Sequence, residues 1–369
     1  MKVICEREKL LSAFQMVTPV VPARSPKPIL QNIKIDVGSD TVTLMGTDLE
    51  IGIRAAVSGV EIKQPGLAIL PTGKMSAILR ECSDEFLTLE SDDSGLSVRG
   101  DRNHFNLPSQ DPHEFPSIAD FDAKHYHKLS GRQLREVIRR TVFATDNESS
   151  RYALGGVYFE LQGGKLTAVG TDGRRMAVCE TTAEESGEAG PQTPTIIPAK
   201  ALSIIERSIG DSDEMCLVAP RANDVLVKSD RAVVYSRLVE GRFPRWRDVL
   251  PDTAGGHKID CVAGPFLSAV RQAAIVTDQD SRGVNFTFAD GQLSLAARVA
   301  NAGQAEVQMP IAYDAEPITI TLDPRYLIDF LRVLEAEQHL TFEIQNGESA
   351  ILCSTDDGYR YVVMPLSRD

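Results

Sequence analysis

Residues 28–52 of the chain, PILQNIKIDVGSDTVTLMGTDLEIG, decide the fold because their pattern returns twice. Tyr152 to Ala177 repeats it as YALGGVYFELQGGKLTAVGTDGRRMA, and a more divergent version runs from Gly283 to Ala297 as GVNFTFADGQLSLAA. The tripeptide Gly-Thr-Asp recurs 124 residues apart, beginning at Gly46 and at Gly170. Such a separation matches a compact domain rather than a short solenoid unit. The sequence therefore predicts three similar domains.

A proline marks a second repeated position. Pro71, Pro198 and Pro324 each open a short amphipathic segment, and they lie 127 and 126 residues apart. Proline suits the start of a helix, where its missing N–H would have no partner in any case. A Phe-Pro pair also closes the first two repeats, at 115–116 and 243–244. The regular spacing supports the division into three.

Each third of the chain is predicted to hold a helix, a hairpin, a proline-started helix and another hairpin. Apolar and polar residues alternate on both sides of the turn at residues 38–40 and of the turn at Asp290-Gly291. The second hairpins are EFLTLESDDSGLSVRG, MCLVAPRANDVLVKSD and LTFEIQNGESAILCST. The expected fold class is α+β, with two helices packed on antiparallel sheets in each domain. Polar stretches place the domains at 1–124, 125–254 and 255–369.

Composition indicates a globular chain without a membrane partner. The 369 residues are 42% hydrophobic and 25% charged, with no apolar run long enough to span a bilayer and no apolar core of a signal peptide at the start. The six cysteines are scattered, which suits a reducing cytoplasm and indicates neither a disulfide framework nor a zinc site. We therefore expect no cofactor or metal, and a cytoplasmic location.

The predicted helices carry basic residues on the face opposite their apolar side. On a helical projection of GRQLREVIRRTVF, Arg132, Arg135 and Arg139 share the polar face. The other members of this set are Lys74, Arg80, Lys200 and Arg207. The whole chain is acidic, with a formal charge of −13, so basic residues collected on one surface create a local attractive field for a polyanion. Solvated helix faces give the same pattern, and charge alone leaves both readings open.

Longer motifs give the chain a family resemblance. REKLLSAFQMV, GTDLEIG, RYALGGVYFE, GTDGRRMAVCE, LVEGRFPRWRDVLP, AAIVTDQDSRGV and the terminal YVVMPL, in this order, resemble the bacterial DNA polymerase III β subunit, the β sliding clamp. The resemblance covers the entire chain. It implies a head-to-tail homodimer of three-domain chains that forms a ring around duplex DNA without reading its sequence. Such a ring is a non-catalytic processivity factor for the replicative DNA polymerase.

The resemblance also implies sites. It places Arg24 and Tyr152 near the DNA, beside the basic helix residues, and it pairs Phe105 and Leu107 with Ile275 and Val276 at the dimer interface. A groove for hydrophobic peptides of the polymerase, the clamp loader and other clamp-binding-motif proteins would be formed by Leu154, Thr171, Gly173, Arg174, Arg175, Met176, Pro244, Val249, Val362, Met364, Pro365 and Leu366. Arg174 stands where a histidine is expected, Asp248 where a basic residue is usual, and the tail continues to Ser367-Arg368-Asp369. These departures bear on peptide preference.

Two other classes of protein are alternatives. A repeat scaffold would bind peptides without encircling DNA. A hydrolase would need a catalytic group, but Asp93-Ser94-Gly95 is half of an aspartic-protease signature without its second half, and its residue types suit a hairpin turn. His125 and His127 resemble a metal-binding pair, yet they lie in a predicted polar linker without an obvious third ligand.

Overall fold

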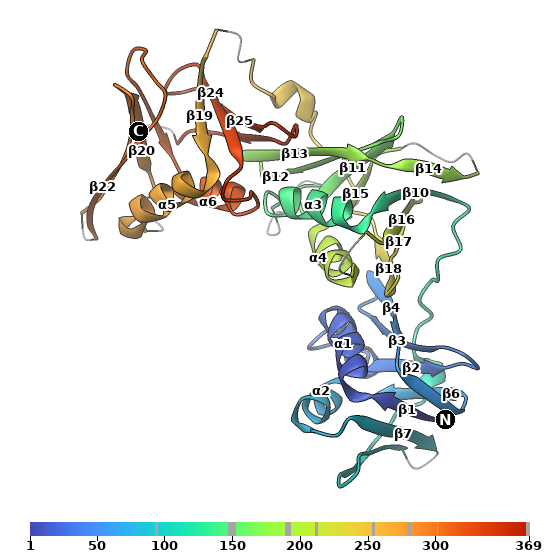
Figure 1. Cartoon of the computed structure of the whole chain (residues 1–369). Coiled ribbons are helices and arrows are strands. Elements are labelled where there is room, and N and C mark those ends of the chain that lie inside the picture. Colours follow the sequence, from blue (N-terminus) through green and yellow to red (C-terminus); the bar gives the residue numbers. More distant parts are fainter. Residues whose placement is uncertain are drawn as a thin grey trace. The chain divides into compact units, whose positions relative to one another are not determined.

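The computed structural model describes residues 1–92, 95–146, 153–188, 193–210, 213–252, 255–278, 282–300 and 302–366. Figure 1 shows the helices and strands of the chain in sequence order from blue to red. The chain forms two compact units, which divide the middle repeat between them. Unit 1 contains Met1–Arg135 and Ala183–Leu238, and unit 2 contains Glu136–Thr182 and Val239–Asp369.

The order of helices and strands repeats three times along the chain. The first repeat holds β1 (Lys2–Glu6), α1 (Arg7–Val17), β2 (Ile33–Val37), β3 (Val42–Thr47), β4 (Ile51–Val57), β5 (Val60–Gln64), β6 (Gly66–Leu70), α2 (Thr72–Glu81), β7 (Phe86–Asp92), β8 (Gly95–Arg99) and β9 (His104–Leu107). The second holds β10 (His125–Ser130), α3 (Gly131–Val142), β11 (Gly156–Gln162), β12 (Lys165–Thr171), β13 (Arg175–Thr182), β14 (Glu184–Gly187), β15 (Thr195–Pro198), α4 (Ala199–Ser208), β16 (Met215–Pro220), β17 (Asp224–Lys228) and β18 (Ala232–Arg237). The third holds β19 (His257–Val262), α5 (Ala263–Ala273), β20 (Val284–Ala289), β21 (Gln292–Val299), β22 (Gly303–Pro310), β23 (Ile318–Leu322), α6 (Pro324–Leu331), β24 (His339–Ile344), β25 (Ile351–Thr355) and β26 (Arg360–Val363).

Unit 1 contains a five-stranded antiparallel sheet in the order β5-β1-β7-β8-β9 and a nine-stranded one in the order β14-β10-β16-β17-β18-β4-β3-β2-β6. Helix α1 packs on β3 and β4 and against α2, while α4 packs on β18. The apolar face of α1 is buried through Leu10, Phe14 and Val17. The nine-stranded sheet joins two repeats, because β18 pairs with β4 through Tyr235 opposite Gly52 and Ser236 opposite Ile51.

Unit 2 repeats this arrangement. Its strands run β11-β12-β13-β26-β25-β24-β19 in one sheet and β22-β21-β20-β23 in a four-stranded sheet. Helix α5 packs on β21 and β22 and against α6, which packs on β26. The pairing of β26 with β13 sets Val362 opposite Met176 and Val363 opposite Arg175. The last strand of the third repeat thus meets the second repeat as β18 meets the first.

The glycine of the Gly-Thr-Asp motif lets a helix approach the sheet closely. A Cβ on Gly46 would lie 2.6 Å from Cγ1 of Val17 in α1, and one on Gly170 would lie 2.1 Å from the carbonyl oxygen of Thr141 in α3. Carbon and oxygen atoms in such contacts are normally about 3.3–3.6 Å apart. The motif therefore begins with glycine because no side chain fits between the strand and its helix.

The structure confirms the α+β fold, with six α-helices in the described residues packed on antiparallel sheets. It corrects one local expectation, since His125 and His127 lie in β10 rather than in a linker, and His127 is buried. A buried histidine reads as polar in a hydropathy pattern, which concealed the strand. Residues 93 and 94 of the Asp-Ser-Gly turn lie outside the described residues.

Candidate functional site

A small cavity of about 110 Å³ opens beside the junction of β13 and β26 in unit 2. Its lining residues are Thr171, Gly173, Arg174, Arg175, Met176, Pro244, Trp246, Val249, Val362 and Met364. All but Trp246 belong to the predicted peptide groove. Trp246 was missed, although an aromatic residue two positions after a Phe-Pro pair was the available signal. We call this cavity the first groove.

A tight turn between β12 and β13 shapes the first groove. The Thr171 hydroxyl donates to the carbonyl of Arg175 at 2.6 Å and accepts from the amide of Gly173 at 3.1 Å. One oxygen of Asp172 accepts from the amides of Arg174 and Arg175 at 2.9 and 3.0 Å. Gly173 has φ +84°, a left-handed conformation that favours glycine. Threonine and aspartate are thus required here because their side chains satisfy the turn.

Arg175 stabilises this turn through two ion pairs and a hydrogen bond. Its guanidinium contacts Asp172 at 3.0 Å and Asp329 at 2.7 Å, and it donates to the carbonyl of Phe143 at 2.8 Å. The guanidinium carbon lies 4.7 Å from the centre of the Tyr326 ring. Burial disfavours its charge, but Tyr361 and the two carboxylates outweigh that effect and raise the pKa of Arg175 above its ordinary value. Arg175 is therefore a permanently charged structural centre rather than a mobile ligand group.

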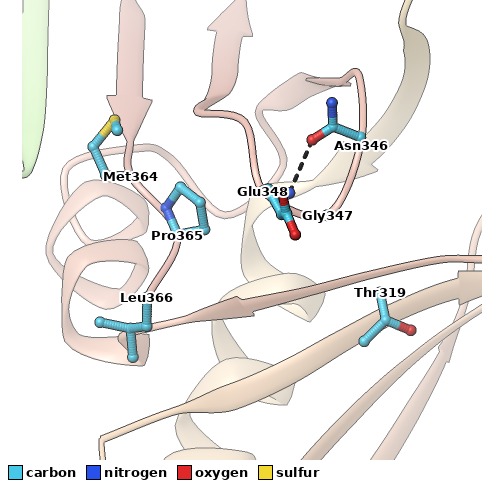
Figure 2. A pocket seen from close by; sticks show the side chains of 7 residues that line it. All are labelled: Thr319, Asn346, Gly347, Glu348, Met364, Pro365 and Leu366. Carbon is cyan, nitrogen blue, oxygen red and sulfur yellow. Dashed lines mark hydrogen bonds between the residues drawn. The ribbon is translucent and has the colours of Figure 1, made fainter. Parts of the chain in front are cut away.

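A second cavity, of about 620 Å³, adjoins the first through Met364. Figure 2 shows its lining residues, which are Thr319, Asn346, Gly347, Glu348, Met364, Pro365 and Leu366. The segment that separates the cavities is fixed at both ends, because the amide of Met364 donates to Arg174 at 2.9 Å and that of Leu366 to Thr321 at 2.8 Å. Asn346 holds the facing loop by accepting from the amide of Glu348 at 2.9 Å. The predicted Pro365 and Leu366 therefore line this cavity instead of the first.

The edge of the first groove is apolar and accessible. Val249 is 50% exposed and Met364 is 43% exposed, which is unusual for side chains of this size. Trp246 is buried beneath the Arg247 guanidinium, which lies 4.3 Å from its ring centre. Leu154 is also buried and does not line either cavity; its carbonyl accepts from Asp146 at 2.9 Å. Exposed apolar side chains around a fixed cavity suit an apolar ligand.

Charged residues around the first groove show how its two sequence departures are accommodated. The exposed Arg174 hydrogen-bonds to the side chain of Tyr326, which raises the pKa of Arg174. Asp248 forms an ion pair with Arg245 at 3.3 Å, and Glu160 forms one with Arg247 at 2.5 Å. Asp248 is therefore balanced by its own neighbour in sequence and not by Arg174.

Most of the predicted DNA-binding residues are exposed. They are Arg24 in the loop before η2 (Pro28–Gln31), Lys74 and Arg80 on α2, Arg132 and Arg139 on α3, and Lys200 and Arg207 on α4. Lys200 also forms an ion pair with Asp48 at 2.6 Å. Arg135 has a structural contact that the helical projection did not reveal, because it donates to the carbonyls of Ile209 and Gly210 at the end of α4. Tyr152 lies outside the described residues.

Two of the four predicted interface residues lie on an edge strand, and the other two lie in a turn that packs beside one. Phe105 and Leu107 are half-buried on β9, which ends the five-stranded sheet of unit 1. Ile275 and Val276 belong to the turn η5 (Ala274–Val276) after α5, and Ile275 is 78% exposed. This turn contacts β21 and β22, the last of which ends the four-stranded sheet of unit 2.

Among the described residues, no three His, Cys, Asp or Glu side chains gather as metal ligands would. No helix in the described part of the chain is long and apolar enough to cross a membrane.

Three repeated helix-on-sheet domains, with an apolar groove at a domain junction, define the class of DNA sliding clamps. Family models agree with this class: the N-terminal, central and C-terminal domains of the DNA polymerase III β subunit match residues 1–119, 128–245 and 247–367. The chain belongs to the DNA polymerase III β subunit family. This family consists of non-catalytic processivity factors, so the predicted role as a DNA polymerase sliding clamp is confirmed and the hydrolase interpretation is wrong.

Individual relatives match over the whole length. A β sliding clamp of Proteus mirabilis is 31% identical and covers 99% of this chain and 100% of its own. Two solved structures of sliding clamps bound to griselimycin, from Pseudomonas aeruginosa and Bartonella birtlesii, are 27% and 28% identical with TM-scores of 0.91 and 0.90. Each covers 100% of both chains.

Proposed function

We propose that two copies of this chain close head to tail into a ring around duplex DNA, and that the first groove binds peptide segments of replication proteins. The observation that carries the ring is the repetition of one strand junction. The final strand of the second repeat pairs with the first repeat (β18 with β4), and the final strand of the third pairs with the second (β26 with β13).

The corresponding junction between the first and the third repeat is not formed within the described chain. The counterpart of β18 and β26 in the first repeat is β9, and the counterpart of β4 and β13 in the third is β22. Both end their sheets in the described structure. An edge strand exposes N–H and C=O groups that seek partners, so β9 of one copy would pair with β22 of the other. Two copies form this junction twice, which closes the assembly.

Apolar side chains at these edges supply the driving force for the dimer. Ile275, Val276, Phe105 and Leu107 would be covered by the partner, and a fully buried side chain of this kind contributes about 1.5–3 kcal/mol. Ile275 contributes most, since it is 78% exposed in the single chain.

The proposed domain boundaries remain 1–124, 125–254 and 255–369.

A ring that slides needs weak contacts with DNA. The long side chains of Arg24, Lys74, Arg80, Arg132, Arg139, Lys200 and Arg207 would meet phosphates without reading bases, with Arg135 and Tyr152 nearby. The surplus of acidic residues elsewhere keeps this attraction local. The ion pair of Lys200 with Asp48 limits how strongly Lys200 would bind a phosphate.

The first groove would hold an extended peptide with a pair of hydrophobic side chains. One of these two side chains would enter the first groove between Val362 and Pro244. The other side chain would lie toward Pro365 in the adjoining larger cavity, with Met364 between the two. The partners would be the replicative polymerase, the clamp loader and other proteins with such a motif, in the cytoplasm. The griselimycin-bound relatives support the view that clamps of this family accept peptide-like ligands.

Loading onto DNA tests encirclement. The protein is loaded by a clamp loader onto nicked circular DNA, which is then linearised. We expect retention in high salt on circles and loss from linear ends; equal retention on both would contradict the proposal. A separate titration with a hydrophobic-pair peptide should show weaker binding to Met364→Ala, and unchanged affinity would mean that the groove lies elsewhere.

A further inference from the structure

We propose that the junction of β18 and β4 in unit 1 holds a second peptide-binding groove, which prefers a hydrophobic residue flanked by basic residues. A cavity of about 450 Å³ opens there. Its lining residues include Thr47, Leu49, Gly52, Pro116, Ile118 and Tyr235. This inference extends the proposed function of the first groove, on which it rests, to a site related to it by the internal repeat.

The two junctions share the same hydrogen bonds from threonine and aspartate side chains to the backbone of the turn. The Thr47 hydroxyl donates to the carbonyl of Ile51 at 2.8 Å and accepts from the amide of Leu49 at 2.9 Å, as Thr171 does with Arg175 and Gly173. Asp48 accepts from the amides of Glu50 and Ile51 at 3.0 and 2.7 Å, as Asp172 does one repeat later. The second groove is thus built on the same frame.

The strands across the junction also correspond. The amide of Arg237 donates to Glu50 at 2.9 Å, and that of Met364 donates to Arg174 at the same distance. Tyr235 opposite Gly52 therefore takes the place of Val362 opposite Met176. Pro116 and Ile118 follow Phe115 as Pro244 and Trp246 follow Phe243. A Cβ on Gly52 would lie 2.7 Å from Ile118, so the isoleucine fills the space that a side chain at residue 52 would need.

Leu49 indicates that this cavity receives a ligand. It has φ +81° at the position where Gly173 has φ +84°, and a bulky residue in this conformation is strained. Its side chain is 42% exposed at the cavity. A strained backbone that presents an apolar side chain to solvent is explained if a ligand covers that side chain.

Charge selects the partner. Glu50 occupies the position of Arg174, a reversal of sign at corresponding places on the two turns. Around the second groove, Asp120 is 66% exposed and its partner Arg54 is 23% exposed, while Asp122 is 79% exposed and Arg221 is 37% exposed. In these two pairs the acidic member is the more exposed. Glu50 is 64% exposed beside its partner Arg237 at 62%, whereas Lys200 at 55% is more exposed than its partner Asp48 at 18%. Asp120, Asp122 and Glu50 therefore supply the exposed acidic groups of the second groove.

The first groove shows the opposite pattern. Arg245 is 81% exposed beside Asp248 at 64%, and Arg247 is 58% exposed beside Glu160 at 19%. Complementary charges determine which partner a surface accepts more than how tightly it binds. The second groove therefore fits a segment rich in lysine or arginine, and the first tolerates acidic neighbours.

Two labelled octapeptides with the same central Leu-Phe pair, one flanked by lysines and one by glutamates, test this inference on the full chain by fluorescence anisotropy. Leu49→Asn removes the apolar side chain while asparagine tolerates the left-handed backbone. We expect this variant to bind the lysine-flanked peptide about tenfold more weakly and to bind the glutamate-flanked peptide with unchanged affinity. Glu50→Arg should reduce the preference for the lysine peptide in the second groove. Met364→Ala should weaken only the glutamate peptide.

The outcomes separate the two proposals. Absence of lysine-peptide binding up to about 1 mM, a measured affinity unaffected by Leu49→Asn, or loss of this binding in Met364→Ala would each overturn the second groove. Failure of the glutamate peptide to respond to Met364→Ala would instead contradict the first groove. Photo-crosslinking of the lysine peptide should label residues 47–52 or 116–119; labels only near Met364 would also overturn the inference.

Discussion

Replacing Gly170 with alanine tests whether the repeated motif exists to bring a helix onto its strand. The new Cβ would lie 2.1 Å from the carbonyl oxygen of Thr141 and 3.0 Å from its carbon. These are backbone atoms of α3, so no side chain can rotate away, and the helix must move by more than about 1 Å to restore an ordinary contact. Overpacking of this kind costs about 1–3 kcal/mol, and contact with a helix backbone places Gly170→Ala near the upper value.

Differential scanning calorimetry measures this effect. About 3 kcal/mol lowers the melting temperature of a unit of this size by about 6–12 °C. Gly46→Ala should cost less, because its Cβ would meet the side chain of Val17 at 2.6 Å rather than backbone. Gly73→Ala on α2 is the control, since a Cβ there would meet nothing within 4 Å and alanine favours a helix. A melting temperature of Gly170→Ala within about 2 °C of the parent, or a larger loss of stability in Gly46→Ala than in Gly170→Ala, would contradict this packing role of the glycine.

Three further predictions concern the interface, the first groove and pH. Ile275→Asp should convert the dimer to monomer in analytical ultracentrifugation, whereas Val249→Asp, which also changes an exposed apolar residue, should remain dimeric and lose peptide affinity. Arg175→Met should destabilise unit 2 by about 3–5 kcal/mol because Asp172 and Asp329 lose their partner, and Arg175→Lys should not restore the melting temperature. Burial lowers the pKa of His127 below its ordinary 6.5, so on acidification the unfolded chain binds a proton at this residue before the folded chain does. The free energy of unfolding should therefore decrease as pH falls below 6.5, and it should decrease less steeply in His127→Gln. Equal slopes of melting temperature against pH would exclude His127 as the cause.

The repeated hairpins and helices could be predicted because their signals are local. Alternation on both sides of Gly38-Ser39-Asp40 is enough to define β2 and β3, and the prolines lie within one residue of the helix starts at Thr72, Ala199 and Pro324. In contrast, the pairing of Tyr235 with Gly52 joins positions far apart in sequence, and no local pattern encodes it. The boundary of the compact units inside α3 follows from such pairings, which is why it crosses the repeat.

The candidate site also contains residues whose position could be predicted and residues whose contacts could not. Thr171 and Met176 were placed in the first groove by family resemblance, and their own residue types would suit a core equally well. Arg135 looked solvent-facing on a helical projection, but the projection ignores the end of α4, whose carbonyls it reaches. Side-chain contacts between elements distant in sequence decide such cases, and periodicity carries no information about them.

The distribution of Gly-Thr-Asp connects these observations. The tripeptide occurs at both junctions closed within the chain, where its threonine and aspartate satisfy the turn that precedes β4 or β13. The third repeat lacks it, and β22, the corresponding strand, ends its sheet in the described structure. A turn fixed by four side-chain hydrogen bonds suits a permanent junction, whereas a ring that admits DNA must have a junction that separates. Gly-Thr-Asp therefore accompanies the two strand junctions that are closed within the chain, and we expect the residues that vary around it, Arg174 and Glu50 above all, to determine what each proposed groove binds.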